Sequence, residues 1–191
     1  MKTLIKISIT TFLFAAIALV PVQAQTADKP RVKLSVGPET SVPMGDLSDR
    51  YDWSLGGSIQ AEFPLYRNQL ALTLSGGFYN LFAPNHGYTL GGSRYREDLQ
   101  VLPVKLGLKY FPVGGLFIQG EAGTSFLLNK SDGGYDKEAT FTYSPQVGYR
   151  FNLGGNNVLD AGIKWEGNTK FSENGTANHF LGLRIAYAFS L

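Results

Sequence analysis

The two histidines are the first side chains to test for acid–base chemistry, since histidine titrates closest to neutral pH. His86 lies in the polar stretch "APNHGYTL", and His179 lies just before the apolar stretch that ends the chain. Catalysis would need a nucleophile or a carboxylate within hydrogen-bond reach of the imidazole. Neither histidine lies in a recognised catalytic motif with a nucleophile or a carboxylate. We therefore interpret His86 as a solvated loop residue and His179 as an interface residue. No catalytic residue is predicted.

The carboxylates of "SDGGYDKE" (131–138) are the next candidates, because glycines let a loop curl around a cation. Asp132, Asp136 and Glu138 could bind calcium, but their spacing differs from that of an EF-hand loop. We interpret the segment as a solvated loop and predict no metal site. The chain has no cysteine, which excludes thiolate metal sites and disulfides. The glycine pairs match neither G-x-G-x-x-G nor a P-loop, so no cofactor is predicted.

The remaining charged candidates alternate with apolar residues. In "FLGLRIAYAFSL" (180–191), Arg184 occupies the face opposite Leu181, Leu183 and Ile185. The same alternation over the whole chain collects charged residues on one face: Lys33, Glu39, Glu62, Lys105, Lys109, Glu121, Arg150, Asp160, Lys164, Glu166 and Arg184. Six are basic and five acidic, so they nearly cancel. Because an unpaired buried charge is costly, this set predicts an ion-pair network in an interior.

Strands must position these residues, because period-2 alternation covers nearly the whole chain after its N-terminal segment. We predict eight of them, at about 32–41, 53–65, 69–80, 98–111, 116–128, 139–151, 158–166 and 180–191. Short connections (66–69, 112–115, 153–157) alternate with long polar ones (42–52, 81–97, 129–138, 167–179). Each strand is close to or above the ~9–11 residues that a tilted strand needs to cross a bilayer.

The two faces of these strands differ in charge. The more apolar face comprises 45 positions, none of them charged, whereas small and charged residues dominate the other. A water-soluble barrel would enclose its apolar face, but this polar face is too charged to form such a core. The pattern predicts an inside-out, all-β, eight-stranded antiparallel transmembrane barrel with Arg184 in its lumen. On the lipid face near mid-membrane, an arginine would cost ~2–4 kcal/mol.

Aromatic residues cluster near both ends of the predicted strands, which is typical of the girdles at membrane interfaces. Pro103 and Pro145 fall inside strands, where each removes a hydrogen-bond donor from the ladder. A closed barrel has no edge strand to accept them, so we expect bulges or local bends at both positions.

The first 24 residues predict a cleaved secretory signal peptide. Lys2 and Lys6 precede an apolar stretch, and Val22-Gln23-Ala24 is a small-residue cleavage site. A short segment, 25–31, then leads to the barrel at 32–191. Removing residues 1–24 removes two of the 17 basic residues and no acidic one, which leaves 15 of each. Without a basic excess, nucleic acid is not expected as a partner.

Together, the signal peptide, the even strand number, the alternating connection lengths and the apolar-aromatic last strand resemble small eight-stranded outer-membrane barrels of the OmpA/OmpX type. The broad family is that of the outer membrane protein β-barrel domain. The resemblance implies a monomer in the outer membrane of a Gram-negative bacterium, in contact with lipid and lipopolysaccharide and inserted by the barrel-assembly machinery. Loops 81–97 and 129–138 are where an extracellular ligand or partner would bind. Leu191 departs from the frequent aromatic terminus, with Phe189 two residues earlier.

The favoured function is that of a non-enzymatic membrane protein with a structural role or a binding role through its loops. One alternative is a soluble lipocalin-like barrel that carries an apolar ligand, although a ligand calyx should be apolar. The other is a lipid-modifying barrel enzyme. Deacylases of that kind carry a His two residues before a Ser, and neither His86 nor His179 is followed in this way.

Strand register can be predicted across two short connections. If facing residue numbers sum to 310 across 153–157, Arg150 lies directly opposite Asp160. A sum of 226 across 112–115 would place Lys105 opposite Glu121. Arg184 should reach either Asp160 or, across the closing seam between the last strand and the first, Glu39.

Overall fold

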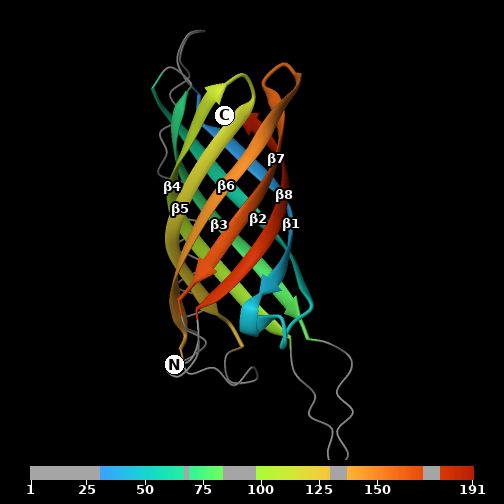
Figure 1. Ribbon diagram of the computed structural model, residues 1–191. Coiled ribbons are helices and arrows are strands. Elements are labelled where there is room, and N and C mark those ends of the chain that lie inside the picture. Colours follow the sequence, from blue (N-terminus) through green and yellow to red (C-terminus); the bar gives the residue numbers. More distant parts are fainter. Residues whose placement is uncertain (1–30, 67–68, 84–97, 130–136, 170–176) are drawn as a thin grey trace, which may run out of the picture.

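The computed structural model describes residues 31–66, 69–83, 98–129, 137–169 and 177–191. The predicted signal peptide and most of the segment 25–31 lie outside these ranges. Eight antiparallel strands close into one barrel in chain order, with β1 paired to β8 (Figure 1). The strands are β1 (Lys33–Met44), β2 (Trp53–Tyr66), β3 (Leu70–Phe82), β4 (Leu99–Val113), β5 (Leu116–Leu127), β6 (Ala139–Gly154), β7 (Asn157–Asn168) and β8 (Asn178–Ser190). The predicted fold class is confirmed.

The two ends of the barrel carry different connections. At one end, which we call the short-turn end, β2–β3, β4–β5 and β6–β7 are joined by a few residues, and β8 ends there (Figure 1). The opposite, long-loop end carries the connections β1–β2, β3–β4, β5–β6 and β7–β8. A short 3-10 helix, η1 (Gly45–Leu47), lies in the first of these. No helix among the described residues is long and apolar enough to cross a membrane.

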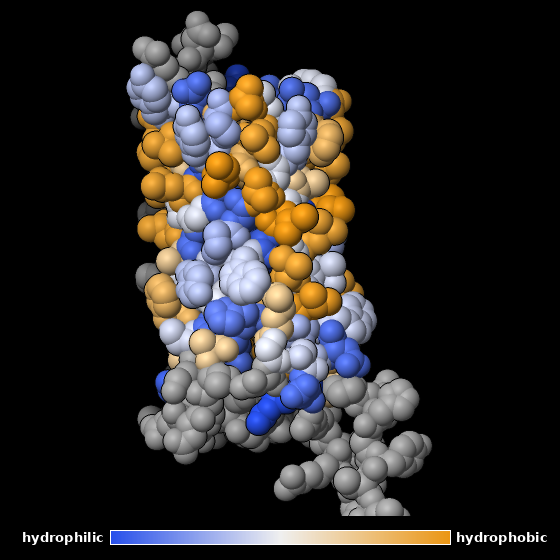
Figure 2. Space-filling view, in the orientation of Figure 1, coloured by the Kyte–Doolittle hydropathy of each residue, from blue (hydrophilic) through white to orange (hydrophobic). Residues whose placement is uncertain are grey.

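The outer wall is apolar. None of the 45 uncharged positions predicted for the lipid face is buried, and Val36, Leu106 and Ile163 are each more than half exposed. Hydrophobic side chains cover much of the visible wall between the two ends (Figure 2). Burying this surface in lipid removes it from water, which stabilises the protein at ~25 cal/mol per Å². The wall therefore faces lipid, as the alternation predicts.

The strand prolines do not produce the predicted bulges. Register is unchanged on the two sides of Pro103 and on the two sides of Pro145. Instead, two consecutive residue pairs are missing from the ladder on one side of each proline. For Pro103 this is the ladder between β3 and β4, and for Pro145 it is the ladder between β6 and β7. The ladder with the other neighbouring strand, β5 in both cases, is continuous through each proline.

Bulges occur beside the short turns. Register shifts lie between Pro64 and Tyr66, between Tyr110 and Val113, and between Asn152 and Gly154. The β4–β5 turn contains Gly114 at φ 54°, a left-handed conformation that is easiest for glycine. These shifts set the register of the hairpins and hence which lumen side chains meet.

Candidate functional site

The lumen contains two clusters of charged side chains. The inner cluster, near the short-turn end, consists of Glu62, Lys109, Arg150 and Asp160. Lys109 Nζ lies 2.7 Å from Glu62 Oε1 and 2.5 Å from Asp160 Oδ2. Arg150 donates through Nε and Nη2 to the two oxygens of Asp160, at 2.7 and 2.6 Å. Its Nη2 also lies 2.8 Å from Glu62 Oε1. Each cation thus contacts both carboxylates.

Two aromatic rings lie against the inner cluster on its short-turn side. Phe117 is fully buried, and its ring centroid lies 4.1 Å from Lys109 Nζ. The Phe111 ring lies 4.6 Å from Arg150 Cζ, and the two rings pack edge to face at 6.0 Å. A cation over a ring face is attracted by the ring quadrupole. The rings therefore form an apolar floor that also stabilises the two cations.

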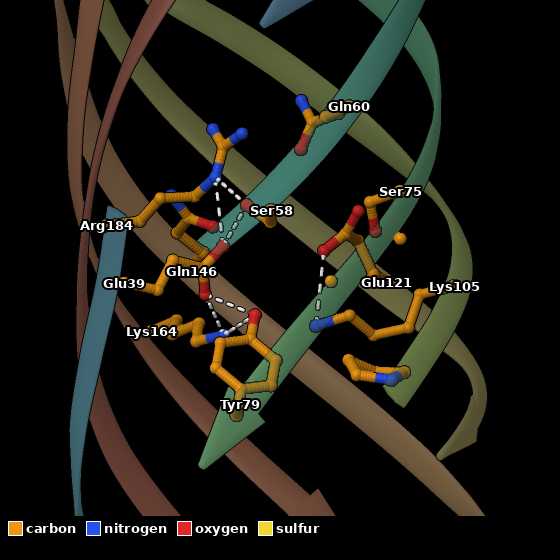
Figure 3. Close-up of a pocket in the computed structure, with 13 residues that line it drawn as sticks. Glu39, Ser58, Gln60, Ser75, Tyr79, Lys105, Glu121, Gln146, Lys164 and Arg184 are labelled. Carbon is orange, nitrogen blue, oxygen red and sulfur yellow. Dashed lines mark hydrogen bonds and ion pairs between the residues drawn. The ribbon is translucent and has the colours of Figure 1, made fainter. Parts of the chain in front are cut away.

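The outer cluster lies toward the long-loop end and contains six charged residues. They are Glu39, Lys105, Glu121, Lys164, Glu166 and Arg184 (Figure 3 shows all but Glu166 labelled). Lys105 Nζ lies 2.9 Å from Glu166 Oε2 and 3.7 Å from Glu121 Oε2. Lys164 forms ion pairs with Glu39 and, at 3.3 Å, with Glu166. The cluster is thus one connected network.

Arg184 connects β8 with β1 and β2 across the closing seam of the barrel. It lies opposite Glu39 in the ladder, and its Nε lies 3.1 Å from Glu39 Oε1. Nε also donates to Ser58 Oγ at 2.9 Å, and Nη2 donates to Ser35 Oγ at 3.0 Å. Asp160 and Glu39 were the two partners expected for Arg184, and in the structure it pairs with Glu39. Asp160 faces Ala186 instead.

Uncharged polar side chains extend both clusters. The Tyr79 hydroxyl donates to Glu39 Oε2 at 2.6 Å and accepts from Lys164 Nζ at 3.1 Å. Between the clusters, Gln119 Nε2 donates to Gln60 Oε1 at 3.0 Å, and Gln60 Nε2 donates to Glu62 Oε1 at 3.1 Å. The role of Tyr79 was not predicted from the sequence.

The charges balance within each cluster. The inner cluster has two cations and two carboxylates, and the outer cluster has three of each. The eleventh predicted residue, Lys33, belongs to neither. It is half-buried at the short-turn end, where its Nζ donates to Ser190 Oγ at 3.1 Å. The predicted set has one more cation than carboxylates. That cation lies at the rim of the barrel, where an unpaired charge has the lowest desolvation cost.

One register prediction matches the structure and the other does not. Arg150 lies opposite Asp160, as a sum of 310 requires. Lys105 lies opposite Gly123, and Glu121 lies opposite Gly107, a sum of 228 rather than 226. Val113 pairs with Leu116 next to the turn, and a β-bulge separates this pair from the rest of the ladder. Because the shift is two residues, both side chains still face the lumen and remain close enough to pair.

An apolar cap fills the lumen at the long-loop end. Its members are buried and come from the first long connection and from four strands: Leu47, Tyr51, Tyr79, Leu81, Leu99, Val101, Leu127 and Phe180. The sequence did not predict this cap, although five of its eight members lie within predicted strands: Tyr79, Leu99, Val101, Leu127 and Phe180. At these strand ends the lumen-facing residues are themselves apolar, as Phe180 beside Leu181 and Leu127 beside Leu128 show, which weakens the alternation of polarity.

The other candidates from the sequence do not form a site. His179 stacks on Trp165, with ring centroids 5.5 Å apart. His86, Asp132 and Asp136 lie outside the described residues, as does most of loops 81–97 and 129–138. Within the described ranges, no group of three or more histidine or acidic residues is placed to hold a metal ion.

Comparison with known proteins supports the architecture. Residues 12–189 match the model of the family described as "Outer membrane protein beta-barrel domain". A search of curated proteins gave no match. The fold is similar to that of Neisserial surface protein A, at 14% identity and a TM-score of 0.57, covering 84% of this chain and 97% of that one.

Two further solved structures show the same fold. The outer membrane protein AlkL, determined in DMPC bilayers, is 14% identical with a TM-score of 0.54, and the match covers 90% of this chain and 94% of that one. OprG from Pseudomonas aeruginosa is 13% identical with a TM-score of 0.50, covering 85% and 97%.

Proposed function

The chain belongs to the outer membrane protein beta-barrel domain family and is an integral protein of the Gram-negative outer membrane, and from this premise we propose that it is a closed, non-catalytic scaffold that presents its long loops at the cell surface. In such barrels the long loops are extracellular and the short turns periplasmic. The soluble lipocalin-like alternative is wrong, because the family is a membrane family and the lumen is charged.

One observation supports the proposal: side chains occupy the lumen in successive layers, and two cavities among them have volumes of only about 10 and 20 Å³. From the periplasmic end, the Phe111–Phe117 floor is followed by the inner cluster, the glutamine layer, the outer cluster and the apolar cap. An eight-stranded barrel is just wide enough for side chains to fill. A filled lumen leaves the loops as the part of the molecule that is free to interact.

The same packing argues for a role without catalysis. Every carboxylate in the two clusters contacts at least one cation, and each is buried. A general acid or base needs access to a substrate proton. These carboxylates instead neutralise neighbouring cations, so we assign them a structural role.

Hydrogen bonds near the ends of β3, β4 and β5 support removing the β3–β4 loop without opening the barrel. Asp98, at the start of β4, accepts from the Ala83 backbone N–H at 3.0 Å and from Asn80 Nδ2 at 2.8 Å. Asn129 Nδ2 donates to the Asp98 carbonyl at 2.6 Å. These bonds join β3, β4 and β5 below the loop. Replacing 84–97 with a short turn should therefore leave the barrel intact.

The test compares cells that lack the protein with cells that express either the intact protein or this replacement. We expect the intact protein to change adhesion or serum survival and the replacement to lose that effect, with antibiotic uptake the same in all three strains. Heat-modifiable gel mobility confirms that the replacement folds. Surface phenotypes that survive removal of the loop, or antibiotic uptake that depends on the protein, would contradict the proposal.

A further inference from the structure

Among the strand pairings of the barrel, the closing seam between β1 and β8 alone joins strands that are not consecutive in the chain. In a hairpin, the turn sets the register. The seam has no such turn, and its facing residues Glu39 and Arg184 are 145 positions apart in the sequence. A slip of two residues would keep every side chain on its correct face. Something other than a turn must therefore fix the register of the seam.

The lipid-facing side of the seam does not fix its register. Apolar residues follow one another along this side of β1 and β8, among them Val36, Leu183 and Ile185, which are all exposed. Lipid chains do not distinguish between two such registers. Backbone hydrogen bonds do not either, because the antiparallel ladder repeats every two residues. Two pairs are in any case missing from this ladder, at Gly37 and Pro38. Side chains in the lumen must therefore set the register.

Glu39 is the lumen side chain that joins β1 to the rest of the barrel (Figure 3). It is 4% exposed. Arg184 of β8 donates through Nε to its Oε1 at 3.1 Å, and the Tyr79 hydroxyl of β3 donates to its Oε2 at 2.6 Å. Lys164 of β7 and Ser58 of β2 also donate to it. It thus contacts four other strands. Among the described contacts, each of the other carboxylates in the two clusters reaches side chains of at most two other strands.

Arg184 completes the contact from the other side of the seam. It is the only lysine, arginine, aspartate or glutamate of β8. Besides Glu39, its guanidinium bonds to Ser58 Oγ at 2.9 Å and to Ser35 Oγ at 3.0 Å. Before β1 and β8 meet, one strand edge carries an unpaired anion and the other an unpaired cation. The two edges are therefore complementary in charge, and a buried charge left without its partner is costly.

A slip of two residues along the seam would separate these partners. It would move β7 and β8 by ~7 Å relative to β1 and carry both bonded cations away from Glu39. A single pair tolerates such an offset, since Lys105 and Glu121 are two residues out of register and still lie 3.7 Å apart. Glu39 does not have this freedom, because its bonds to β2 and β3 hold the carboxylate in place.

We propose that Glu39 and Arg184 form a register latch, the pair that selects the register in which β1 and β8 join when the barrel closes. A buried charge pair adds little net stability over well-packed apolar residues, but it penalises every arrangement in which its members do not meet. The latch therefore acts on the specificity of closure rather than on its strength. Closure in another register would also change the stagger of the strands around the barrel.

Disulfide cross-links can report the register of the seam, because the chain has no cysteine of its own. Val36 lies opposite Tyr187 on the lipid-facing wall, so Val36→Cys with Tyr187→Cys reports the observed register. Val36→Cys with Ile185→Cys, or with Phe189→Cys, reports a slip of two residues in one direction or the other. In the observed register these last two pairs are diagonal, with Cα atoms ~7–8 Å apart, which is too far for a disulfide.

The test compares these cross-links after folding in lipid vesicles and oxidation. Without further changes, we expect the observed-register pair alone to cross-link. Glu39→Gln with Arg184→Gln removes one charge of each sign, so the outer cluster stays balanced. The ratio of slipped to observed-register cross-links should then rise about tenfold or more, because hydrogen bonds to charged groups no longer favour one register. Glu62→Gln with Arg150→Gln is the matched control. It removes an ion pair of the inner cluster that does not cross the seam, and it should leave the ratio unchanged.

A second variant covers the case in which the glutamine variant does not fold. Glu39→Met with Arg184→Met replaces the same pair with apolar side chains, which a buried site often tolerates. It should keep the heat-modifiable gel mobility of a folded barrel and show the same rise in slipped cross-links. A folded latch variant that forms only the observed-register cross-link, or an equal rise in the inner-cluster control, would overturn the proposal. Failure of both latch variants to fold when the control folds would also overturn it, because the pair would then act on stability.

Discussion

At the scale of single residues, Asp160 illustrates how a charge can lie inside a membrane protein. It is 1% exposed, and its two oxygens accept three hydrogen bonds from Arg150 and Lys109. Charge-assisted bonds of this kind are stronger than neutral ones. The desolvation cost of two buried cations is thereby offset, but only while both carboxylates of the inner cluster are present.

Removing one of these carboxylates should be costly. We expect Asp160→Ala to lower the free energy of unfolding by ~3–5 kcal/mol, because Lys109 and Arg150 are then left with a single counter-charge. A urea series in lipid vesicles measures the change. Lys33→Ala is the control: the rim lysine bonds only to Ser190 among the described contacts and should cost less than about 1 kcal/mol. Equal stability of the Asp160 variant and the wild type would show that the inner cluster is not stabilising.

At the scale of strands and turns, the sequence predicts much of the barrel because alternation of polarity is a strong signal. The alternation predicts the number and order of the strands. It also predicts the face on which each of the eleven charged residues lies. Where alternation stops, prediction stops as well. The apolar cap lies where lumen-facing residues such as Leu99 and Phe180 are themselves apolar, so polarity alone does not assign them to the lumen.

Register shows a second limit of the sequence. A shift of one residue would move every side chain to the wrong face, and alternation excludes it. A shift of two residues keeps every face correct. The sequence therefore could not distinguish Lys105 opposite Glu121 from Lys105 opposite Gly123, which is the observed pairing. The difference depends on the pairing of Val113 with Leu116 next to the turn and on the bulge between Tyr110 and Val113, details of turn geometry that polarity does not encode.

The β4–β5 turn gives a test at this scale. Gly114 adopts φ 54° with open space around it, so an added methyl group meets no neighbour but requires a left-handed backbone. Gly114→Ala should cost ~1–2 kcal/mol of stability. Gly120→Ala is the matched control, since Gly120 also has open space and no left-handed φ, and it should cost little. Chemical denaturation of both variants in vesicles measures the two costs, and equal costs would contradict the conformational explanation.

At the scale of the whole molecule, the barrel is the reverse of a soluble protein, with lipid as solvent for its apolar wall. Leu183 lies near the middle of β8 and is 43% exposed on that wall. Leu183→Arg should reduce stability in a bilayer by ~2–4 kcal/mol, because the charge enters the hydrocarbon layer.

Leu128→Arg is the control for that substitution. It introduces the same charge just beyond the end of β5, at the long-loop end, where the expected cost is ~0–1 kcal/mol. Folding titrations of both variants in lipid vesicles measure the difference. Equal costs at the two positions would mean that Leu183 does not face the hydrocarbon layer.

Closure of the lumen is the central claim, and electrical conductance tests it most directly. The purified, folded protein is reconstituted into a planar lipid bilayer, with a 16-stranded porin in a parallel chamber as the positive control, because barrels of that size leave an aqueous channel. The aromatic floor, the two charge-balanced clusters and the apolar cap predict no steady ion channel under conditions in which the porin conducts. A steady, large conductance from the wild-type protein would show that the lumen is open and would contradict the closed scaffold.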